Sequence, residues 1–425
     1  MNRKISPSIK DAVDFSLTLK PYQSATLDNG IPVYMIDAGS QEVVSLEIVF
    51  PAGKVFEDDR KLSAVTNALL KNGTQTRSAL EINEAFDYYG AFCKCTRRNE
   101  SADISIHSLS KHLDKLLPVL QDMIENPVFP QEELDIYIQN NKQNLQVAMK
   151  KCDYVGDLLI DRYVFGPAHP YGSYTRPEDL DRITREDVVS FYNQHYVNAG
   201  VRIFVAGRLP NGIVEMLNAS LGKIKAKAPE KDFPLIPVHP AEEKKFRVTN
   251  DDTAVQGAIR IASPFPGILH EDYADSFVLN TLFGGFFGSR LMRNIREDKG
   301  YTYGIHSFIQ SNMHQSAWQI STEAGKDVCE AAIKEVYAEM EKLRNEKIDT
   351  QELLLVKNYI MGIMLSSLDG PFKIMSRWRR IVMNNLPDDH FQKTITTIKN
   401  ASPQKMQELA KKYLRPENFY ELVVY

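Results

Sequence analysis

The sequence predicts an α+β fold made of two tandem repeats of one α/β domain, each an antiparallel-type sheet with helices packed on one face. Three observations predict it. The chain has 425 residues, which suggests two domains of about 200 residues each. The order of apolar patterns in the first half recurs in the second. Residues 221–246 have the lysine- and proline-rich composition of a linker. We therefore expect one repeat over 1–230 and another over 231–425, with a boundary near Lys231.

The first repeat begins with a hairpin, because Asp28-Asn29-Gly30 is a hairpin turn signal. Apolar alternation from Val44 to Phe50 then predicts a strand. The other expected elements are helices over 62–71 and 78–89, strands over 91–98 and 102–109, helices over 112–125, 132–149 and 185–196, and a strand over 200–207.

The second repeat follows the same order, with Gly300 falling on Gly90. Asp349 and Glu352 form a capping-box signature at the start of a late helix. The matched segments are 254–267 with 43–53, 275–285 with 62–73, 289–309 with 79–98, 326–360 with 111–145, and 403–425 with 186–207.

Composition excludes several classes of protein. Hydrophobic residues make up 43% and charged residues 25%, and 51 basic against 55 acidic residues leave a net charge of −4. These values are ordinary for a globular protein and do not favour nucleic acid or an anionic membrane as a partner. No secretory or transmembrane segment is visible. Four cysteines make no disulfide framework, and we interpret Cys93 and Cys95 as core residues of a strand. A cytoplasmic location follows.

The stretch 282–310 draws attention to two polar residues. Gly284 and Gly285 close one helix, Ser289 is expected to cap the next, and Gly300 ends it. Arg296 would then lie on the last turn of a helix, and Tyr303 near the start of the next strand. That geometry lets a guanidinium and a phenol converge.

Comparison of the two repeats makes the pair stand out. Aligning Gly90 with Gly300 places Phe86 opposite Arg296 and Cys93 opposite Tyr303. Two polar groups replace two apolar ones on the same scaffold. This favours a functional role over the simpler interpretation of a surface arginine and a half-buried tyrosine.

The run SRL…IRE.KG.TY, the FPAG strand end at 50–53 and the HPYG turn at 169–172 together resemble the pitrilysin/insulinase family. These are zinc peptidases of the inverted HxxEH type, and mitochondrial processing peptidase is among them. The resemblance implies the fold of that peptidase. It also implies that Arg296 and Tyr303 bind the substrate main chain and stabilise the oxyanion of the tetrahedral intermediate. Residues Gly284, Gly285, Gly288 and Ser289 look like a substrate-contacting glycine-rich loop; they lack the Lys-Ser/Thr ending of a phosphate loop.

The metal ligands of that family are missing. HxxEH would fall on residues 64–68, where Ala64, Asn67 and Ala68 cannot serve as ligand, base and ligand. The third ligand is missing as well, because no glutamate occurs between Glu133 and Glu178. No pair among the nine histidines has HxxEH or HxxxH spacing. We therefore expect no metal in this chain.

The resemblance then implies a non-catalytic subunit of a heterodimeric zinc peptidase. An HxxEH-bearing partner would hold the zinc, and Arg296 and Tyr303 would act in trans on a peptide substrate. The alternative is a catalytically inactive scaffold or peptide-binding homodimer of the same fold. A third possibility is an autonomous zinc enzyme with unorthodox ligands.

Overall fold

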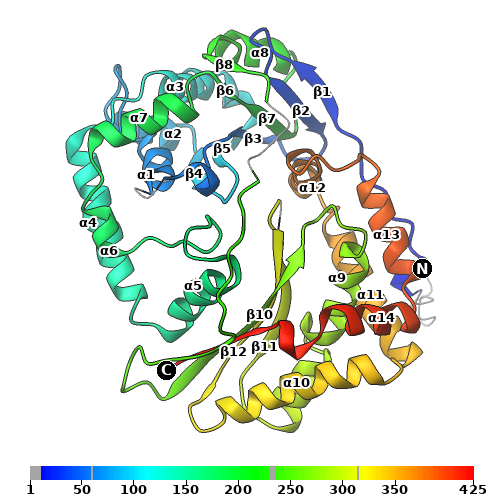
Figure 1. Cartoon of the computed structure of the whole chain (residues 1–425). Coiled ribbons are helices and arrows are strands. Elements are labelled where there is room, and N and C mark those ends of the chain that lie inside the picture. The colour runs from blue at the N-terminus through cyan, green and yellow to red at the C-terminus, as the bar shows by residue number, and fades with distance from the viewer. Residues whose placement is uncertain (1–10, 59–60, 230–234, 314) are drawn as a thin grey trace. The chain divides into compact units, whose positions relative to one another are not determined.

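The computed structural model describes residues 11–58, 61–229, 235–313 and 315–425, which form two compact units (Figure 1). The N-terminal unit comprises Lys20–Ala241 and Gly370–Asn385. The described part of the C-terminal unit comprises 11–19, Glu242–Asp369 and Leu386–Tyr425. The predicted boundary near Lys231 lies outside the described residues. The division differs from the predicted 1–230 and 231–425 because two segments belong to the unit of the other half.

The N-terminal unit contains a six-stranded sheet in the order β1-β2-β7-β3-β5-β4. All neighbours are antiparallel except β2 and β7, so the sheet is mixed rather than wholly antiparallel. The strands are β1 Gln23–Thr26, β2 Pro32–Asp37, β3 Val43–Phe50, β4 Phe92–Arg97, β5 Ala102–Leu109 and β7 Arg202–Gly207, with β6 Ala199–Gly200 and β8 Ala226–Lys227 as a separate pair. The helices are α1 Leu62–Leu69, α2 Ala79–Tyr88, α3 Leu113–Glu125, α4 Gln131–Ala148, α5 Cys152–Phe165, α6 Pro177–Leu180, α7 Arg185–His195, α8 Ile213–Ser220 and α12 Pro371–Met383.

The C-terminal unit contains a five-stranded sheet in the order β11-β12-β10-β13-β9, in which β13 and β9 are parallel. Four of its strands, β11-β12-β10-β13, follow the same order as β4-β5-β3-β7. The strands are β9 Lys245–Val248, β10 Gln256–Pro266, β11 Ile305–Gln310, β12 Gln315–Gly325 and β13 Tyr420–Val424. The helices are η1 Ala12–Asp14, α9 Tyr273–Gly284, η5 Met292–Asp298, α10 Cys329–Asn345, α11 Thr350–Ser366, α13 His390–Asn400 and α14 Pro403–Tyr413.

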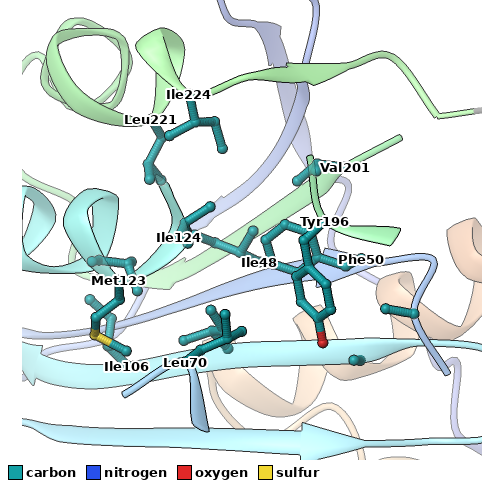
Figure 2. Packing of buried hydrophobic residues seen from close by; sticks show 14 of the residues in the cluster. Ile48, Phe50, Leu70, Ile106, Met123, Ile124, Tyr196, Val201, Leu221 and Ile224 are labelled. Carbon is teal, nitrogen blue, oxygen red and sulfur yellow. The ribbon is translucent and has the colours of Figure 1, made fainter. Parts of the chain in front are cut away.

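The core of the N-terminal unit lies between its sheet and the helices that cover it. Alternation along β3 and β5 turns Ile48, Phe50 and Ile106 toward apolar residues such as Met123 on α3 and Leu70, just after the end of α1 (Figure 2). Cys93 and Cys95 pack against this cluster, as expected of core cysteines. Burial of apolar area of this kind is the main stabilising term of the unit.

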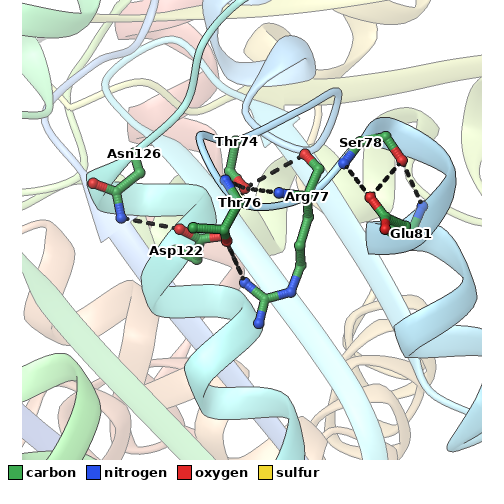
Figure 3. Close-up of polar contacts among 7 residues, drawn as sticks. All are labelled: Thr74, Thr76, Arg77, Ser78, Glu81, Asp122 and Asn126. Atoms are coloured by element: carbon green, nitrogen blue, oxygen red, sulfur yellow. Dashed lines mark hydrogen bonds and ion pairs between the residues drawn. The ribbon is translucent and has the colours of Figure 1, made fainter.

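A polar cluster fixes the loop between α1 and α2 (Figure 3). The carboxylate of Asp122 on α3 accepts hydrogen bonds from Thr74 at 2.6 Å, Thr76 at 2.7 Å and Arg77 at 2.6 Å. Burial alone would raise the pKa of Asp122, but these bonds together lower it. The next residue, Ser78, forms a capping box with Glu81 and begins α2.

Each unit also holds a segment from the other half of the chain. In the N-terminal unit, Arg379 of α12 lies 2.9 Å from Glu47 and 3.2 Å from Asp103. In the C-terminal unit, the backbone N–H of Val13 donates to Asn358 of α11 at 3.1 Å. Among the described residues, no helix is both long and apolar enough to cross a membrane.

Candidate functional site

Arg296 lies in the last turn of a π-helix, η5. The backbone N–H of Lys299 reaches back five residues to the carbonyl of Asn294 at 3.0 Å. The matched helix α2 is an α-helix and carries the buried Phe86 at the corresponding place. Short π-helical segments occur frequently at functional sites. The prediction that Arg296 lies on the last turn of a helix is confirmed. The apolar spacing did not indicate that this helix would be a π-helix.

Gly300 ends this helix in the left-handed conformation, with φ of +66°, and the matched Gly90 has φ of +61°. The backbone N–H of Tyr301 closes the turn on the carbonyl of Ile295 at 3.0 Å. A side chain at either glycine would meet open space, so the backbone conformation and not crowding favours glycine there. The prediction that Gly300 ends the helix is confirmed.

Tyr303 does not belong to the following strand, which begins at Ile305. The hydroxyl of Thr302 accepts a hydrogen bond from the Gly304 N–H at 3.1 Å and donates to the Glu323 carbonyl at 2.7 Å. These bonds hold residues 302–304 in a turn. Tyr303 therefore lies two residues before the strand and not within it, and it projects from the turn with 92% of its surface exposed.

The structure brings Arg296 and Tyr303 together through the main chain. Arg296 Nε donates to the carbonyl oxygen of Tyr303 at 2.9 Å. The guanidinium lies 4.7 Å from the ring centre of Phe287, and Nη1 lies 4.0 Å from the carboxylate of Glu297. The phenol of Tyr303 has no hydrogen-bond partner among the described residues. The Arg296 guanidinium is therefore held against the backbone of Tyr303, and the Tyr303 side chain is exposed at the surface of the C-terminal unit.

The glycine-rich segment that follows α9 is closely packed. A Cβ at Gly284 would come within 2.6 Å of the Ser307 side chain on β11, and one at Gly285 within 2.6 Å of the Thr281 backbone. A Cβ at Gly288 would come within 2.8 Å of the Phe286 ring. These glycines permit close approach, and Gly285 and Phe287 are the exposed residues of the segment.

Ser289 does not cap the next helix, contrary to the prediction. Its side chain is fully buried, and its hydroxyl has no hydrogen-bond partner among the described residues. Its backbone N–H instead bonds the Phe286 carbonyl at 3.1 Å, which makes a tight turn before the helix. Because the residue is buried, its hydroxyl does not face a ligand in this conformation.

Arginines on the same helix fix its position. Arg290 makes a bidentate pair with Glu352 on α11 at 2.8 and 3.0 Å, and Arg293 adds a third contact at 2.7 Å. The spacing of Asp349 and Glu352 had indicated a capping box. That prediction is wrong, because Glu352 pairs with these two arginines instead. Asp349 alone caps α11, through the N–H of Gln351 at 2.6 Å. No local pattern could have identified a partner that lies 62 residues away.

The positions of the missing metal ligands lie on α1. Asn67 is buried and donates to the hydroxyl of Tyr196 at 3.2 Å. Ala64 and Ala68 are half-buried and offer no donor atom. No group of three or more histidine, cysteine or acidic side chains is placed to hold a metal within the described part of the chain. The residues present at α1 therefore do not fit a zinc ion.

Comparison with known families agrees with this architecture. Residues 33–162 match the family model described as Insulinase (Peptidase family M16), and residues 182–360 match the one described as Peptidase M16 inactive domain. An uncharacterized zinc protease of Rickettsia felis is 23% identical over 391 residues, covering 89% of this chain and 92% of the relative. An uncharacterized zinc protease of Bacillus subtilis is 24% identical over 359 residues, covering 83% and 86%.

Solved structures share the fold over nearly the whole chain. A protease from Helicobacter pylori has a TM-score of 0.85 at 16% identity and covers 96% of this chain and 100% of its own. A peptidase M16 inactive domain from Pseudomonas fluorescens has a TM-score of 0.83 at 21% identity, with coverage of 95% and 98%. A chain of Complex III2 from Candida albicans has a TM-score of 0.74 at 15% identity, with 95% coverage of each. The chain therefore belongs to the pitrilysin/insulinase family, peptidase family M16.

Proposed function

We propose that this chain is the non-catalytic subunit of a heterodimeric zinc metallopeptidase, which binds extended peptide and supplies Arg296 and Tyr303 in trans to the partner's catalytic site. The hydrogen bond from Arg296 Nε to the Tyr303 carbonyl, 2.9 Å long, carries the proposal. It joins the two residues into one unit while leaving the outer guanidinium nitrogens and the exposed phenol available to a ligand.

The chemistry of the pair suits an oxyanion. A guanidinium and a phenolic O–H are donors that stabilise negative charge as it develops on a peptide carbonyl oxygen. The arginine can also bond a second carbonyl of the substrate main chain. The partner would contribute an HxxEH helix and its zinc, which activates the attacking water. This chain does not supply that half, because α1 offers Ala64, Asn67 and Ala68 in those places.

The neighbouring surface suits an extended peptide. β11 is an edge strand of the five-stranded sheet, and it leads directly from Tyr303. A peptide can extend such an edge as a further strand, held by main-chain hydrogen bonds. The segment Gly284–Ser289 packs beside β11 through Gly284 and presents Phe287 to solvent. We assign substrate contact to the exposed part of this segment and an anchoring role to the buried Ser289.

The proposal is tested by co-expression with an HxxEH-bearing relative from the same genome, followed by peptide cleavage by each chain alone and by both together. We expect activity from the pair only. Tyr303→Phe should then lower kcat by about 10²–10³, the usual effect of losing an oxyanion donor, and leave assembly intact. Tyr88→Phe is the matched control, because Tyr88 is also highly exposed and lies in the other unit. Wild-type turnover in Tyr303→Phe, or zinc-dependent cleavage by this chain alone, would contradict the assignment.

A second candidate is an inactive scaffold or peptide-binding homodimer. The likeness to a chain of Complex III2 from Candida albicans favours it, because there the same fold is part of a larger assembly that is not named as a peptidase. Sedimentation of the purified chain distinguishes the two candidates. A stable homodimer that neither joins an HxxEH-bearing relative nor alters its activity would favour the scaffold.

A further inference from the structure

A cavity of about 310 Å³ lies within the N-terminal unit, on the side of α1 where Ala64 and Val65 are found. Residues of β4, α4, α5 and α6, of the segment after β3 and of the segment 171–175 line the rest of it. Its size is at the lower end of the range for small-molecule sites. It lies in one unit and does not involve Arg296 or Tyr303.

Three cationic side chains line this cavity: Lys54, Lys61 and Arg97. Lys54 Nζ donates to the carbonyl of Ser173 at 2.6 Å, and Lys61 Nζ donates to the hydroxyl of the same residue at 3.1 Å. Both ammonium groups therefore meet at one residue. Burial lowers the pKa of Lys54 to about 8, and the nearby positive charges of Arg97 and Lys61 add to the effect.

The described lining of the cavity holds fewer carboxylates than cations. Among the lining residues, Asp161 is the one carboxylate. Glu57, which also acts on Lys54, accepts hydrogen bonds from both the backbone N–H and the hydroxyl of Ser63 and so caps the start of α1. The described lining thus has an excess of positive charge. Like charges held together in a partly buried site favour an anion, which relieves their repulsion.

The rest of the lining defines the shape of the ligand. Hydroxyl groups share the lining with the cations, and that of Tyr171 donates to Glu100 at 2.6 Å. Burial raises the pKa of Tyr137 to about 12, so this phenol keeps its proton. Apolar side chains cover the remaining wall. The hydroxyl-bearing residues are Tyr137, Tyr154, Tyr171, Ser173, Tyr174 and Thr175, and the apolar ones are Val65, Leu145, Leu158, Leu180 and Ile183.

We propose that this cavity is a binding site for a small organic anion, with its carboxylate or phosphate group between Lys54, Lys61 and Arg97 and its apolar body against the leucines. The two anionic groups share one recognition chemistry, charge-assisted hydrogen bonds from lysine and arginine. The same side chains repel a metal cation, and Ala64 offers it no ligand atom.

Calorimetric titration of the purified chain at pH 7 tests the proposal, with 3-phenylpropionate, phenyl phosphate, inorganic phosphate and the neutral 3-phenylpropanamide as probes. We expect one of the two organic anions to bind at least tenfold more tightly than the amide. Binding of inorganic phosphate with equal affinity would assign the site to the free anion and overturn the apolar part of the proposal. Equal binding of acid and amide would overturn the whole of it.

Variants locate the binding. Lys54→Gln and Arg97→Gln should each weaken the anion at least tenfold, while Lys94→Gln, an exposed lysine of the same strand as Arg97, should change nothing. Ala64→Leu fills the cavity without removing a charge and should also abolish binding. This variant guards against the possibility that Lys54→Gln loses binding through a folding defect.

The affinity for the organic anion should fall between pH 7 and 9 as Lys54 loses its proton. Equal loss in Lys94→Gln, or full binding by Ala64→Leu, would contradict the assignment. No partner is needed, so the result does not depend on the peptidase proposal.

Discussion

At the scale of single residues, the site depends on a glycine, Gly284, because a side chain there would collide with the neighbouring strand. Gly284 is the last residue of α9 and lets this helix touch β11. Beneath that contact lies a buried network in which Ser307 donates to Asn280 at 2.7 Å and accepts from the Trp318 indole at 2.9 Å. The backbone approach and the network together position the start of β11, from which Tyr303 is only two residues removed.

We predict that Gly284→Ala lowers the free energy of unfolding by about 1–3 kcal/mol, because the added Cβ would lie 2.6 Å from Ser307 and force the helix and strand apart. Urea denaturation measures the change. Gly362→Ala is the matched control, since this glycine lies inside α11 with nothing within 4 Å of an added Cβ. That variant should be more stable by about 0.5–1 kcal/mol. Equal effects of the two would show that crowding at Gly284 is unimportant.

At the scale of elements, the half-buried Glu352 and the buried Asp272 fix the helices that carry or support the site. Glu352 of α11 receives Arg290 and Arg293 from the helix of Arg296. Burial raises the pKa of Glu352, but the hydrogen bonds and charges of the two arginines outweigh it and lower the value. Asp272, which precedes α9, likewise accepts hydrogen bonds from three side chains of α14.

Removal of the Glu352 charge should loosen the helix that carries Arg296. We predict that Glu352→Gln costs about 1–3 kcal/mol in unfolding free energy, because two arginines lose a charged acceptor in a largely buried place. In the assembled peptidase of the proposal, kcat should fall as well. Lys393→Gln is the control, because its pair with Asp389 is exposed and should change stability by less than about 0.5 kcal/mol. A fully active and stable Glu352→Gln would show that the arginines are not needed for positioning.

The pH dependence of stability should reveal Asp272. Burial would raise the pKa of this carboxyl, but Lys412, Tyr413 and Lys405 donate to it and lower the pKa to about 2. A carboxyl with a lowered folded-state pKa stabilises the fold above its unfolded pKa of about 3.9 and loses that contribution as the pH falls toward 2. We predict that Asp272→Asn costs about 2 kcal/mol at pH 7, and that its difference from the wild type narrows below pH 4. A constant difference from pH 7 to pH 3 would contradict this.

At the scale of the whole molecule, the chain exchanges segments between its halves. Helix α12 comes from the second half of the sequence and belongs to the N-terminal unit, where Arg379 meets Glu47 and Asp103 on the sheet. Burial raises the pKa of Glu47, with Arg379 acting against that rise. The N-terminal segment from Asp11 makes the reverse connection, with Asn358 donating to Asp11 at 3.0 Å in the C-terminal unit. Each unit therefore needs both halves of the chain for its complete structure.

We predict that Arg379→Met lowers the free energy of unfolding by about 1–3 kcal/mol, because the buried Asp103 and the half-buried Glu47 each lose an ion-pair partner, while Arg98 stays 2.9 Å from Asp103. Limited proteolysis should then cut near residues 367–370 and 385–389, which flank α12. Replacing Glu47 by Gln in the same chain should recover part of the loss. If Arg379→Met is as stable as the wild type, the helix is held by apolar contacts alone.

The sequence predicted the elements of the fold well. Apolar periodicity and glycine stops located the strands β3, β4 and β5 and the helices α1, α2 and α3 near their observed places, because these signals depend on neighbouring residues. The likeness of the two halves identified Gly90 and Gly300 as equivalent, and both have the left-handed conformation. It also singled out Arg296 and Tyr303, which the structure joins by a hydrogen bond. The cytoplasmic location and the partner remain predictions.

The tertiary structure decided what depends on residues far apart in the chain. Thr302 bonds to Glu323 and takes Tyr303 out of the strand, Glu352 bonds two arginines and not the end of its own helix, and α12 packs against the sheet of the other half. The cationic cavity also depends on residues far apart in the chain, because it is lined by Lys54, Arg97 and Tyr137 from separate elements. By itself the sequence determined the family, the order of elements and the loss of the metal ligands, because these are properties of local pattern and residue identity. The tertiary structure alone decided which polar groups bond to one another, because a long-range hydrogen bond produces no periodic pattern in the sequence.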